Sequence, residues 1–130
     1  MNILIIDDSK TVRKSLAAIL KTTHHKLYEA ETGIEGFGAA FEIRPDIIFI
    51  DVMMPRFDGL QLCELLKKQQ WAKKIMICML TGKETLLDKA KIKNSGANHL
   101  ILKPFDTQNL LNFLKSVEEK TFNKSINIFE

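Results

Sequence analysis

Five polar residues lie at or just past the end of short apolar runs, and their side chains could together handle a phosphoryl group. They are Asp7, Asp8, Asp51, Thr81 and Lys103. Carboxylates that crowd together in a partly buried crevice ionise together only when a cation compensates their charge. Magnesium suits such a site because it takes one or two carboxylates, keeps several waters and bridges to phosphate. The residue types therefore indicate a magnesium-dependent phosphoryl site.

Asp51 is the expected nucleophile of this site. It stands alone after the apolar run DIIFI, whereas Asp7 and Asp8 are adjacent and suited to binding a metal and its waters. A carboxylate beside a metal-held phosphate can form an acyl phosphate. Lys103 would place a positive charge on one phosphoryl oxygen, and the Thr81 hydroxyl would donate to another. We therefore expect phosphorylation on Asp51.

The elements that must position these residues alternate between strands and helices. Short apolar runs predict strands at about residues 2–7, 26–30, 46–51, 75–80 and 98–102. Helical spacing of apolar residues predicts helices at about residues 10–22, 33–43, 60–69, 84–94 and 106–119. This alternation is typical of an α/β fold with a parallel sheet, in which ligands bind outside the carboxyl ends of the strands. The five polar side chains should therefore converge on one site.

A few residues refine this pattern. Ser9 is expected to cap the first helix, and Arg44, which precedes Pro45, should end the second. Three glycines weaken the helical pattern over 33–43. Trp71 should be a partly buried anchor after the third helix.

Composition favours one small cytoplasmic domain. The chain has 130 residues, 45% of them hydrophobic, which suffices for one core. Its start, MNILIIDDSK, does not resemble a secretory signal, and no stretch approaches a membrane span. Cys63 and Cys78 lie in apolar company, which indicates reduced core cysteines. We expect a domain over residues 1–120 and a loose tail over 121–130.

The charge distribution does not indicate nucleic-acid binding, and the placement of the histidines does not indicate a metal site. The net charge of +3 arises from 19 basic and 16 acidic residues, and the basic ones are mostly lysines spread along the chain. Nucleic-acid binding is therefore not indicated. His24 and His25 have no cysteine or acidic partner at metal-ligand spacing, so we expect a surface loop there.

The chain resembles a response-regulator receiver domain of the CheY type over residues 2–119. The motifs that carry the resemblance are Asp7-Asp8-Ser9, DVMMPRFDG beginning at Asp51, LTG at 80–82 and KPF at 103–105. Such a domain has a doubly wound, flavodoxin-like sheet of five parallel strands in the order 2-1-3-4-5. The strings DDSKTVRKS and PDIIFIDVMMPRFDG are further similar to single-domain regulators of type IV pilus motility, the PilG-type branch.

The resemblance also implies ligands and partners. Mg²⁺ would be held by Asp8, Asp51 and the main-chain carbonyl of Met53, with Asp7 acting largely through water. A CheA-like histidine kinase would supply the phosphoryl group, and a downstream protein effector would bind the altered surface. Such a stand-alone receiver would be a monomer or a weak dimer on phosphorylation, without nucleic-acid or membrane partners. It would not be an enzyme beyond its own autophosphorylation and autodephosphorylation.

The expected switch departs from the common receiver pattern. Leu100 stands where many receivers carry Tyr or Phe, and Asn98 and His99 replace an acidic pair. Leucine has no polar handle to stabilise an exposed position, so it should stay packed inward. The response to phosphate would then come mainly from Thr81 and the loop that carries Lys83.

Two positions should tune the lifetime of the acyl phosphate. Met53 and Lys83 flank the path that the hydrolytic water takes in receivers. Methionine cannot orient water through a hydrogen bond as an amide could. We therefore expect slow autodephosphorylation.

Two other function classes remain open from the sequence. An aspartyl-phosphate phosphatase of the haloacid dehalogenase type also uses aspartate, threonine and lysine on a parallel sheet. Its nucleophile would lie on the first strand in Asp-x-Asp spacing, whereas this strand ends Asp7-Asp8-Ser9. An interaction module that has lost phosphorylation control is the second alternative, and Leu100 is the feature that favours it.

Overall fold

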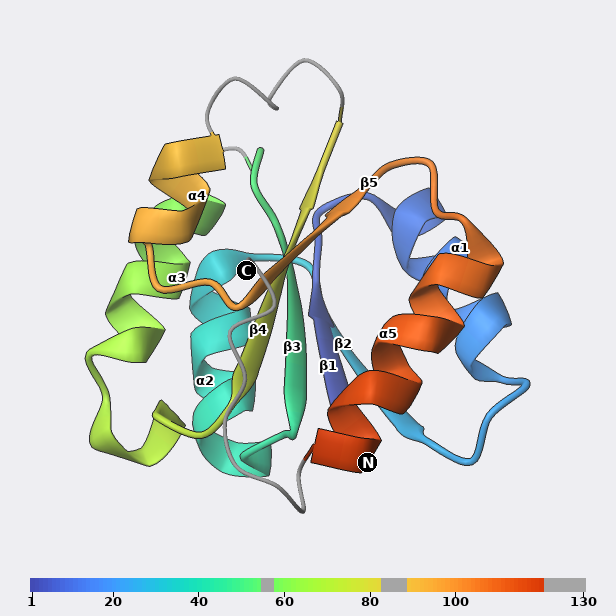
Figure 1. The fold of residues 1–130 in the computed structure, drawn as a ribbon. Helices are drawn as coiled ribbons and strands as arrows, with labels where there is room; N and C mark the ends of the chain where they lie inside the picture. Colours follow the sequence, from blue (N-terminus) through green and yellow to red (C-terminus); the bar gives the residue numbers. More distant parts are fainter. Residues whose placement is uncertain (55–57, 83–88, 121–130) are drawn as a thin grey trace.

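A computed structural model describes residues 1–54, 58–82 and 89–120 of the chain. Its centre is a sheet of five parallel strands in the order β2-β1-β3-β4-β5 (Figure 1), as predicted. The strands are β1 Asn2–Ile6, β2 Lys26–Ala30, β3 Ile47–Asp51, β4 Met76–Thr81 and β5 His99–Leu102. The predicted tail over 121–130 lies outside the described residues.

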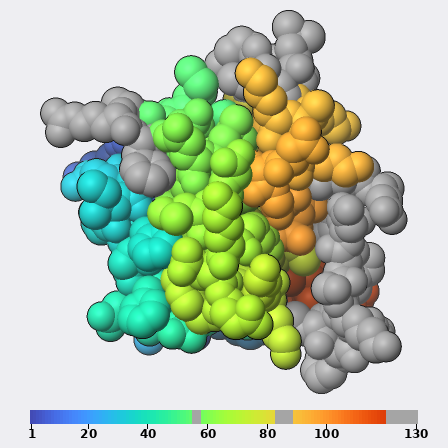
Figure 2. Space-filling view, turned by 90° about the vertical axis from the view of Figure 1, so that its left-hand side faces the viewer, coloured from blue at the N-terminus to red at the C-terminus, as the bar shows by residue number. Residues whose placement is uncertain are grey.

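Helices cover both faces of this sheet. They are α1 Lys10–Leu20, α2 Gly33–Ile43, α3 Gly59–Lys67, the short 3-10 helix η1 Gln70–Ala72, α4 Lys89–Asn94 and α5 Thr107–Lys120. Figure 1 shows α1 and α5 on one face and α2, α3 and α4 on the other. Figure 2 shows the second face, where α2, α3 and α4 lie side by side. The predicted helix over 84–94 is described only from Lys89 onward, and no helix of the described part is long and apolar enough to cross a membrane.

The sheet separates two apolar cores. Leu4 and Ile6 of β1 belong to the core under α2, α3 and α4, whereas Ile3 and Ile5 belong to the core under α1 and α5. Because successive side chains of a strand point to opposite faces, a strand covered on both faces reads as a continuous apolar run. Full burial of each such side chain stabilises the fold by about 1.5–3 kcal/mol. This double burial explains why the apolar runs predicted the strands well.

Side-chain caps start four of the described helices, and Asp106 caps α5 by accepting from Asn109 N over 3.0 Å. Ser9 accepts from Val12 N at the start of α1, as predicted, and Thr32 and Asp58 cap α2 and α3 in the same way. At the other end of α2, Arg44 takes a left-handed conformation with φ 50°. It ends the helix immediately before Pro45, as the sequence predicted.

The helix α2 is regular despite its glycines, and one of them explains why. A Cβ on Gly36 would lie 2.5 Å from Cδ1 and 2.8 Å from Cγ2 of Ile6. Glycine therefore lets α2 approach β1 closely. Trp71, partly buried as predicted, packs edge-on against Phe37 and Phe41 of the same helix.

The cysteines and His24 conform to the prediction, whereas His25 does not. Cys63 and Cys78 are both buried and free of disulfides. His25 is no simple surface-loop residue, because its side chain is only 4% exposed and its Nε2 atom lies 2.8 Å from Glu118 Oε1. The expected surface position is confirmed for His24, which is 76% exposed, but was wrong for His25, since α5 brings a carboxylate from far along the sequence.

The two helical glycines Gly36 and Gly38 should respond oppositely to alanine. A Cβ on Gly38 would lie in open space, with no packed neighbour within 4 Å, so Gly38→Ala should raise the free energy of unfolding by about 0.5–1 kcal/mol. Gly36→Ala should lower the free energy of unfolding by about 1–2 kcal/mol, because the cost of overlap with the fully buried Ile6 exceeds the gain from the higher helix propensity of alanine. Urea unfolding of both variants measures the difference, and equal effects would contradict the close approach.

Candidate functional site

The predicted polar residues meet at the carboxyl edge of the sheet. The strand register brings the ends of β3, β4 and β5 to the same edge, since Asp51 pairs with Leu80 and Thr81 pairs with Leu102. Lys103 follows β5, and its Nζ atom lies 3.0 Å from Asp51 Oδ1 and 3.2 Å from Asp7 Oδ2. Residues from the ends of β1, β3 and β5 therefore form one charged cluster.

The three aspartates offer oxygen ligands to a metal ion. One carboxylate oxygen each from Asp7, Asp8 and Asp51 lies within 4.8 Å of the other two. Asp7 is fully buried, Asp51 is 5% exposed and Asp8 is exposed. Asp7 Oδ2 is buried and has no hydrogen-bond partner among the described residues, although Lys103 faces it as an ion-pair partner. A buried oxygen of this kind and an all-oxygen donor set fit a hard cation such as Mg²⁺.

The environment of the pocket disfavours the negative charge of Asp51 and favours the positive charge of Lys103. Burial, followed by the charge of Asp7, raises the pKa of Asp51, and the hydrogen bond from Lys103 only partly opposes this. For Lys103, burial acts to lower the pKa, but its bonds and charge interactions with Asp51 and Asp7 together raise it. One lysine therefore stays charged between several carboxylates, and the pocket retains net negative charge.

The backbone around Asp51 is held tightly. Met53 N donates to Asp51 Oδ1 over 3.3 Å, and Gly59 N donates to the carbonyl of Val52 over 3.1 Å. A Cβ on Gly59 would overlap the main-chain carbonyl of Asp51. Gly59, which precedes the helix predicted at about residues 60–69, begins α3 and lies directly behind the proposed nucleophile. Only glycine permits this contact.

Asp7 is positioned by two contacts, one of which sequence reasoning missed. Ser9 N donates to Asp7 Oδ1 over 2.9 Å, and the Arg13 guanidinium donates to the Asp7 carbonyl over 2.7 Å. Arg13 was not predicted as a site residue, because a charged residue of this helix does not belong to its apolar pattern. Its side chain is only 12% exposed and also pairs with Glu29. The one available signal was its position near the start of the helix that follows the acidic pair.

Thr81 and Lys103 are fixed relative to each other. Lys103 N donates to the Thr81 carbonyl over 2.8 Å, and Thr81 is almost fully buried at the end of β4. The Thr81 hydroxyl donates to the Gly82 carbonyl over 3.2 Å. Because a hydroxyl rotates, it can donate to a phosphoryl oxygen instead.

An open cleft gives access to this cluster. Asp51, Met53 and Lys103 line it together with Thr11 of α1 and Phe105 of the loop after β5. The Met53 side chain is 67% exposed at the rim. The cleft therefore leaves the Asp51 carboxylate reachable from solvent.

Three residues depart from the common receiver pattern, and they lie in β5 or directly before it: Asn98, His99 and Leu100. Asn98 exchanges two hydrogen bonds with the main chain of Ile77, and His99 stacks on Phe113 with ring centroids 4.5 Å apart. Leu100 is partly buried against the core under α2, α3 and α4. Lys83, the other predicted switch and tuning residue, lies outside the described residues.

Comparison with known proteins places this geometry in a family. The family of the response regulator receiver domain matches residues 3–115. Protein PilG of Pseudomonas aeruginosa is 36% identical over 116 residues, which are 89% of this chain and 86% of PilG. Protein PilH of the same organism is 34% identical over 115 residues, which are 88% of this chain and 95% of PilH. The structure of the chemotaxis response regulator CheY4 of Vibrio cholerae is also similar, with a TM-score of 0.82, 30% identity and coverage of 89% of this chain and 97% of CheY4.

Neutralising Asp51 should stabilise the metal-free fold. Because the folded-state pKa of Asp51 is raised, the folded chain holds the proton more tightly than the unfolded chain. This contribution to stability is present at acid pH and is lost as pH rises from the usual value of 3.8 through the raised pKa. Asp51→Asn should therefore melt at a higher temperature than wild type at pH 7 without Mg²⁺, and the difference should vanish at strongly acid pH. A pH-independent difference, or a lower melting temperature at pH 7, would contradict this account.

Proposed function

Since the chain belongs to the response-regulator receiver family of two-component signalling, we propose that it accepts a phosphoryl group on Asp51 from a histidine kinase. The phosphorylated form then binds a downstream protein. The observation that carries this proposal is the contact of Lys103 with both Asp51 and Asp7 in one cleft. That contact provides a nucleophile and a fixed positive charge at the same point.

The chemistry follows from the side chains present. An Asp51 carboxylate oxygen attacks phosphorus, the phosphorus–nitrogen bond of the kinase phosphohistidine breaks, and its electron pair returns to the imidazole. Lys103 and the Thr81 hydroxyl compensate charge on the phosphoryl oxygens. Asp51 is itself modified, so the protein is a phosphoacceptor rather than an enzyme acting on an external substrate.

Magnesium is part of this proposal. Asp8, Asp51 and the Met53 carbonyl would hold the ion, with Asp7 acting through water. Bound there, it would supply positive charge to the phosphoryl oxygens. The buried Asp7 Oδ2 atom and the three clustered carboxylates support this assignment.

The acyl phosphate should be long-lived. Met53 lies at the rim of the cleft and its thioether cannot orient water by hydrogen bonding. Its exposed side chain is instead free to cover the phosphoryl group.

Chemical phosphorylation distinguishes this proposal from the two alternatives. With acetyl phosphate and Mg²⁺, wild type should be labelled at Asp51 and Asp51→Asn should not be labelled. Asp58→Asn is a matched control, since Asp58 caps α3 and asparagine caps equally well. Label on Asp7 or Asp8 would favour the phosphatase, and no label would favour the degenerate module.

The pathway is a further part of the proposal. The similarity to PilG and to the chemotaxis regulator CheY4 supports a CheA-like kinase and an effector of pilus or chemotaxis type. A pull-down that compares wild type with Asp51→Asn under phosphorylating conditions would identify both partners. A partner of the phosphorylated state should appear with wild type alone.

Magnesium should raise the melting temperature of wild type, because the unfolded chain lacks a preformed site. At a Mg²⁺ concentration of about 100 times Kd, the gain in unfolding free energy is about 2.7 kcal/mol. Asp8→Ala should abolish the shift, whereas Asp58→Ala should retain it. A wild-type melting temperature that does not respond to millimolar Mg²⁺ would show that the pocket is not a metal site.

Leu100 should limit the phosphorylation switch. A modification shifts an equilibrium only by its differential interaction with two states, and Leu100 is already packed against the core. Phosphorylation should therefore raise partner affinity modestly, and Leu100→Tyr should enlarge the ratio of phosphorylated to unphosphorylated affinity. Leu65→Tyr, at a leucine of α3 that is 40% exposed, is the control. An unchanged or smaller ratio in Leu100→Tyr would show that Leu100 does not limit the switch.

A further inference from the structure

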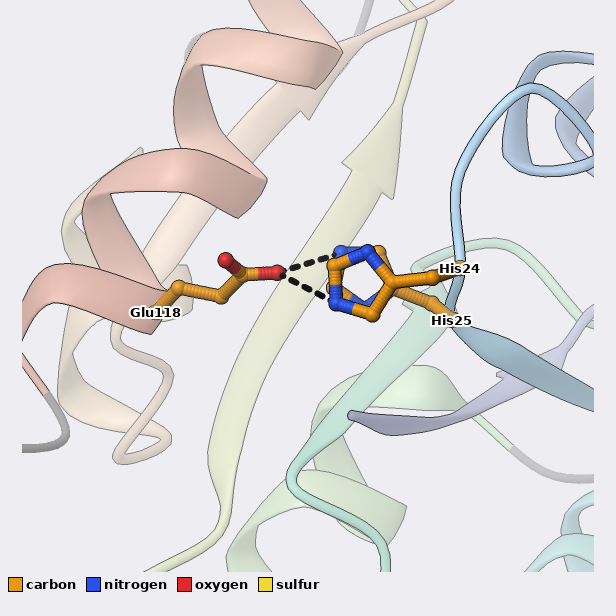
Figure 3. A group of neighbouring side chains, drawn as sticks. All are labelled: His24, His25 and Glu118. Atoms are coloured by element: carbon orange, nitrogen blue, oxygen red, sulfur yellow. Dashed lines mark ion pairs between the residues drawn. The ribbon is translucent and has the colours of Figure 1, made fainter.

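A second cluster of ligating side chains lies away from the phosphoryl cleft. His24 and His25 precede β2 and therefore lie at the amino edge of the parallel sheet, opposite Asp51. Glu118 comes from the last turns of α5. Figure 3 shows both imidazole rings directed at this one carboxylate. The Nε2 atoms of His24 and His25 lie 3.4 Å and 2.8 Å from the same oxygen, Glu118 Oε1.

The loop conformation creates this convergence. Consecutive residues of an extended chain point to opposite sides, but here the two rings lie together with centroids 4.3 Å apart. The Thr23 hydroxyl donates to the carbonyl of Leu20 over 2.6 Å and accepts from His25 N over 3.2 Å. The turn that holds the rings is therefore fixed by its own hydrogen bonds to the end of α1.

The two rings differ in a way that suits a ligand site. His25 is buried, with a side chain 4% exposed, whereas His24 is 76% exposed. The Met1 amino nitrogen lies 2.9 Å from His25 Nδ1, so Nε2 is the ring atom directed at Glu118. Burial, followed by the charge of the amino group, lowers the pKa of His25 and favours its neutral form. An anchored ring thus stands beside a ring that is reachable from solvent.

We propose that His24, His25 and Glu118 bind a divalent transition metal ion, with Zn²⁺ as the best match. One potential ligand atom from each residue lies within 4.8 Å of the other two. Two imidazole nitrogens and one carboxylate oxygen form a donor set for Zn²⁺ rather than for Mg²⁺ or Ca²⁺, which take oxygen ligands. Solvent or another ligand completes the coordination.

Coordination requires only local changes. The Glu118 carboxylate, on a flexible stem, withdraws to admit the ion between itself and the rings. For His25 Nε2 to bind the ion, its proton would leave to solvent while one ammonium proton of Met1 passes to Nδ1. The Nδ1–H group would then donate a hydrogen bond to the neutral Met1 nitrogen. A second group that accepts from the other ring nitrogen is usual for metal-binding histidines. The bound ion would join the loop before β2 to α5.

Zinc titration of the full chain in excess Mg²⁺ tests this site, because Mg²⁺ would compete with Zn²⁺ for the three aspartates of the cleft. Wild type should bind Zn²⁺, melt at a higher temperature and show shifted NMR signals of the His24 and His25 rings. His99, stacked on Phe113, serves as the internal reference ring. Absence of binding, or binding that leaves both ring signals unchanged, overturns the proposal.

Variants locate the ligands. His24→Ala and Glu118→Gln should each weaken Zn²⁺ binding by roughly tenfold or more, since loss of even outer-shell partners costs about 10–100-fold. His24 is exposed, so its removal should leave the fold intact. Glu119→Gln removes the same charge from the neighbouring exposed residue and should bind Zn²⁺ as wild type does. Equal affinity of wild type and His24→Ala, or equal weakening by Glu118→Gln and Glu119→Gln, would overturn the assignment.

Discussion

The pairing of Lys103 with two buried carboxylates is the interaction on which the phosphoryl site depends. Asp7 and Asp51 come from neighbouring strands, and the parallel register of β1 and β3 brings them to the same edge. Removing Lys103 would leave two buried carboxylates facing each other without their cation, and leaving a buried charge uncompensated costs about 3–5 kcal/mol. Lys103 can offset only part of the negative charge, and the remainder favours a bound cation, all the more so because phosphorylation would add negative charge at Asp51.

Much of this arrangement could be predicted from sequence because the strands are buried on both faces. The continuous apolar runs of β1, β3 and β4 fixed the strand positions, and the carboxyl-edge rule then gathered Asp7, Asp51 and Lys103. The contacts that were not predicted depend on tertiary proximity. Arg13 of α1 donates to the Asp7 carbonyl, a contact that the apolar pattern of its helix does not reveal. Glu118 reaches His25 because α5 packs beside the loop after α1, which no local spacing reveals.

The two edges of the sheet present different donor sets. Among the described residues, the carboxyl edge offers the oxygen atoms of three aspartates, a donor set that would suit a hard cation. The amino edge offers two imidazole nitrogens with one carboxylate, a donor set that would suit a softer ion. Because the sheet separates these clusters, an ion at one edge need not displace an ion at the other. This separation allows each cluster to be examined by substitution without altering the other.

The edge strand β5 constrains how a phosphoryl group can change the surface. Lys103 N is bonded to the Thr81 carbonyl, so the two residues that would contact the phosphoryl group cannot separate without breaking a main-chain hydrogen bond. Further along, His99 is stacked on α5 while Leu100 packs into the opposite core. Successive residues thus tie β5 to both helical layers. The signal that we propose to start at Asp51 should therefore travel through side-chain rearrangement around Thr81 rather than through displacement of the strand.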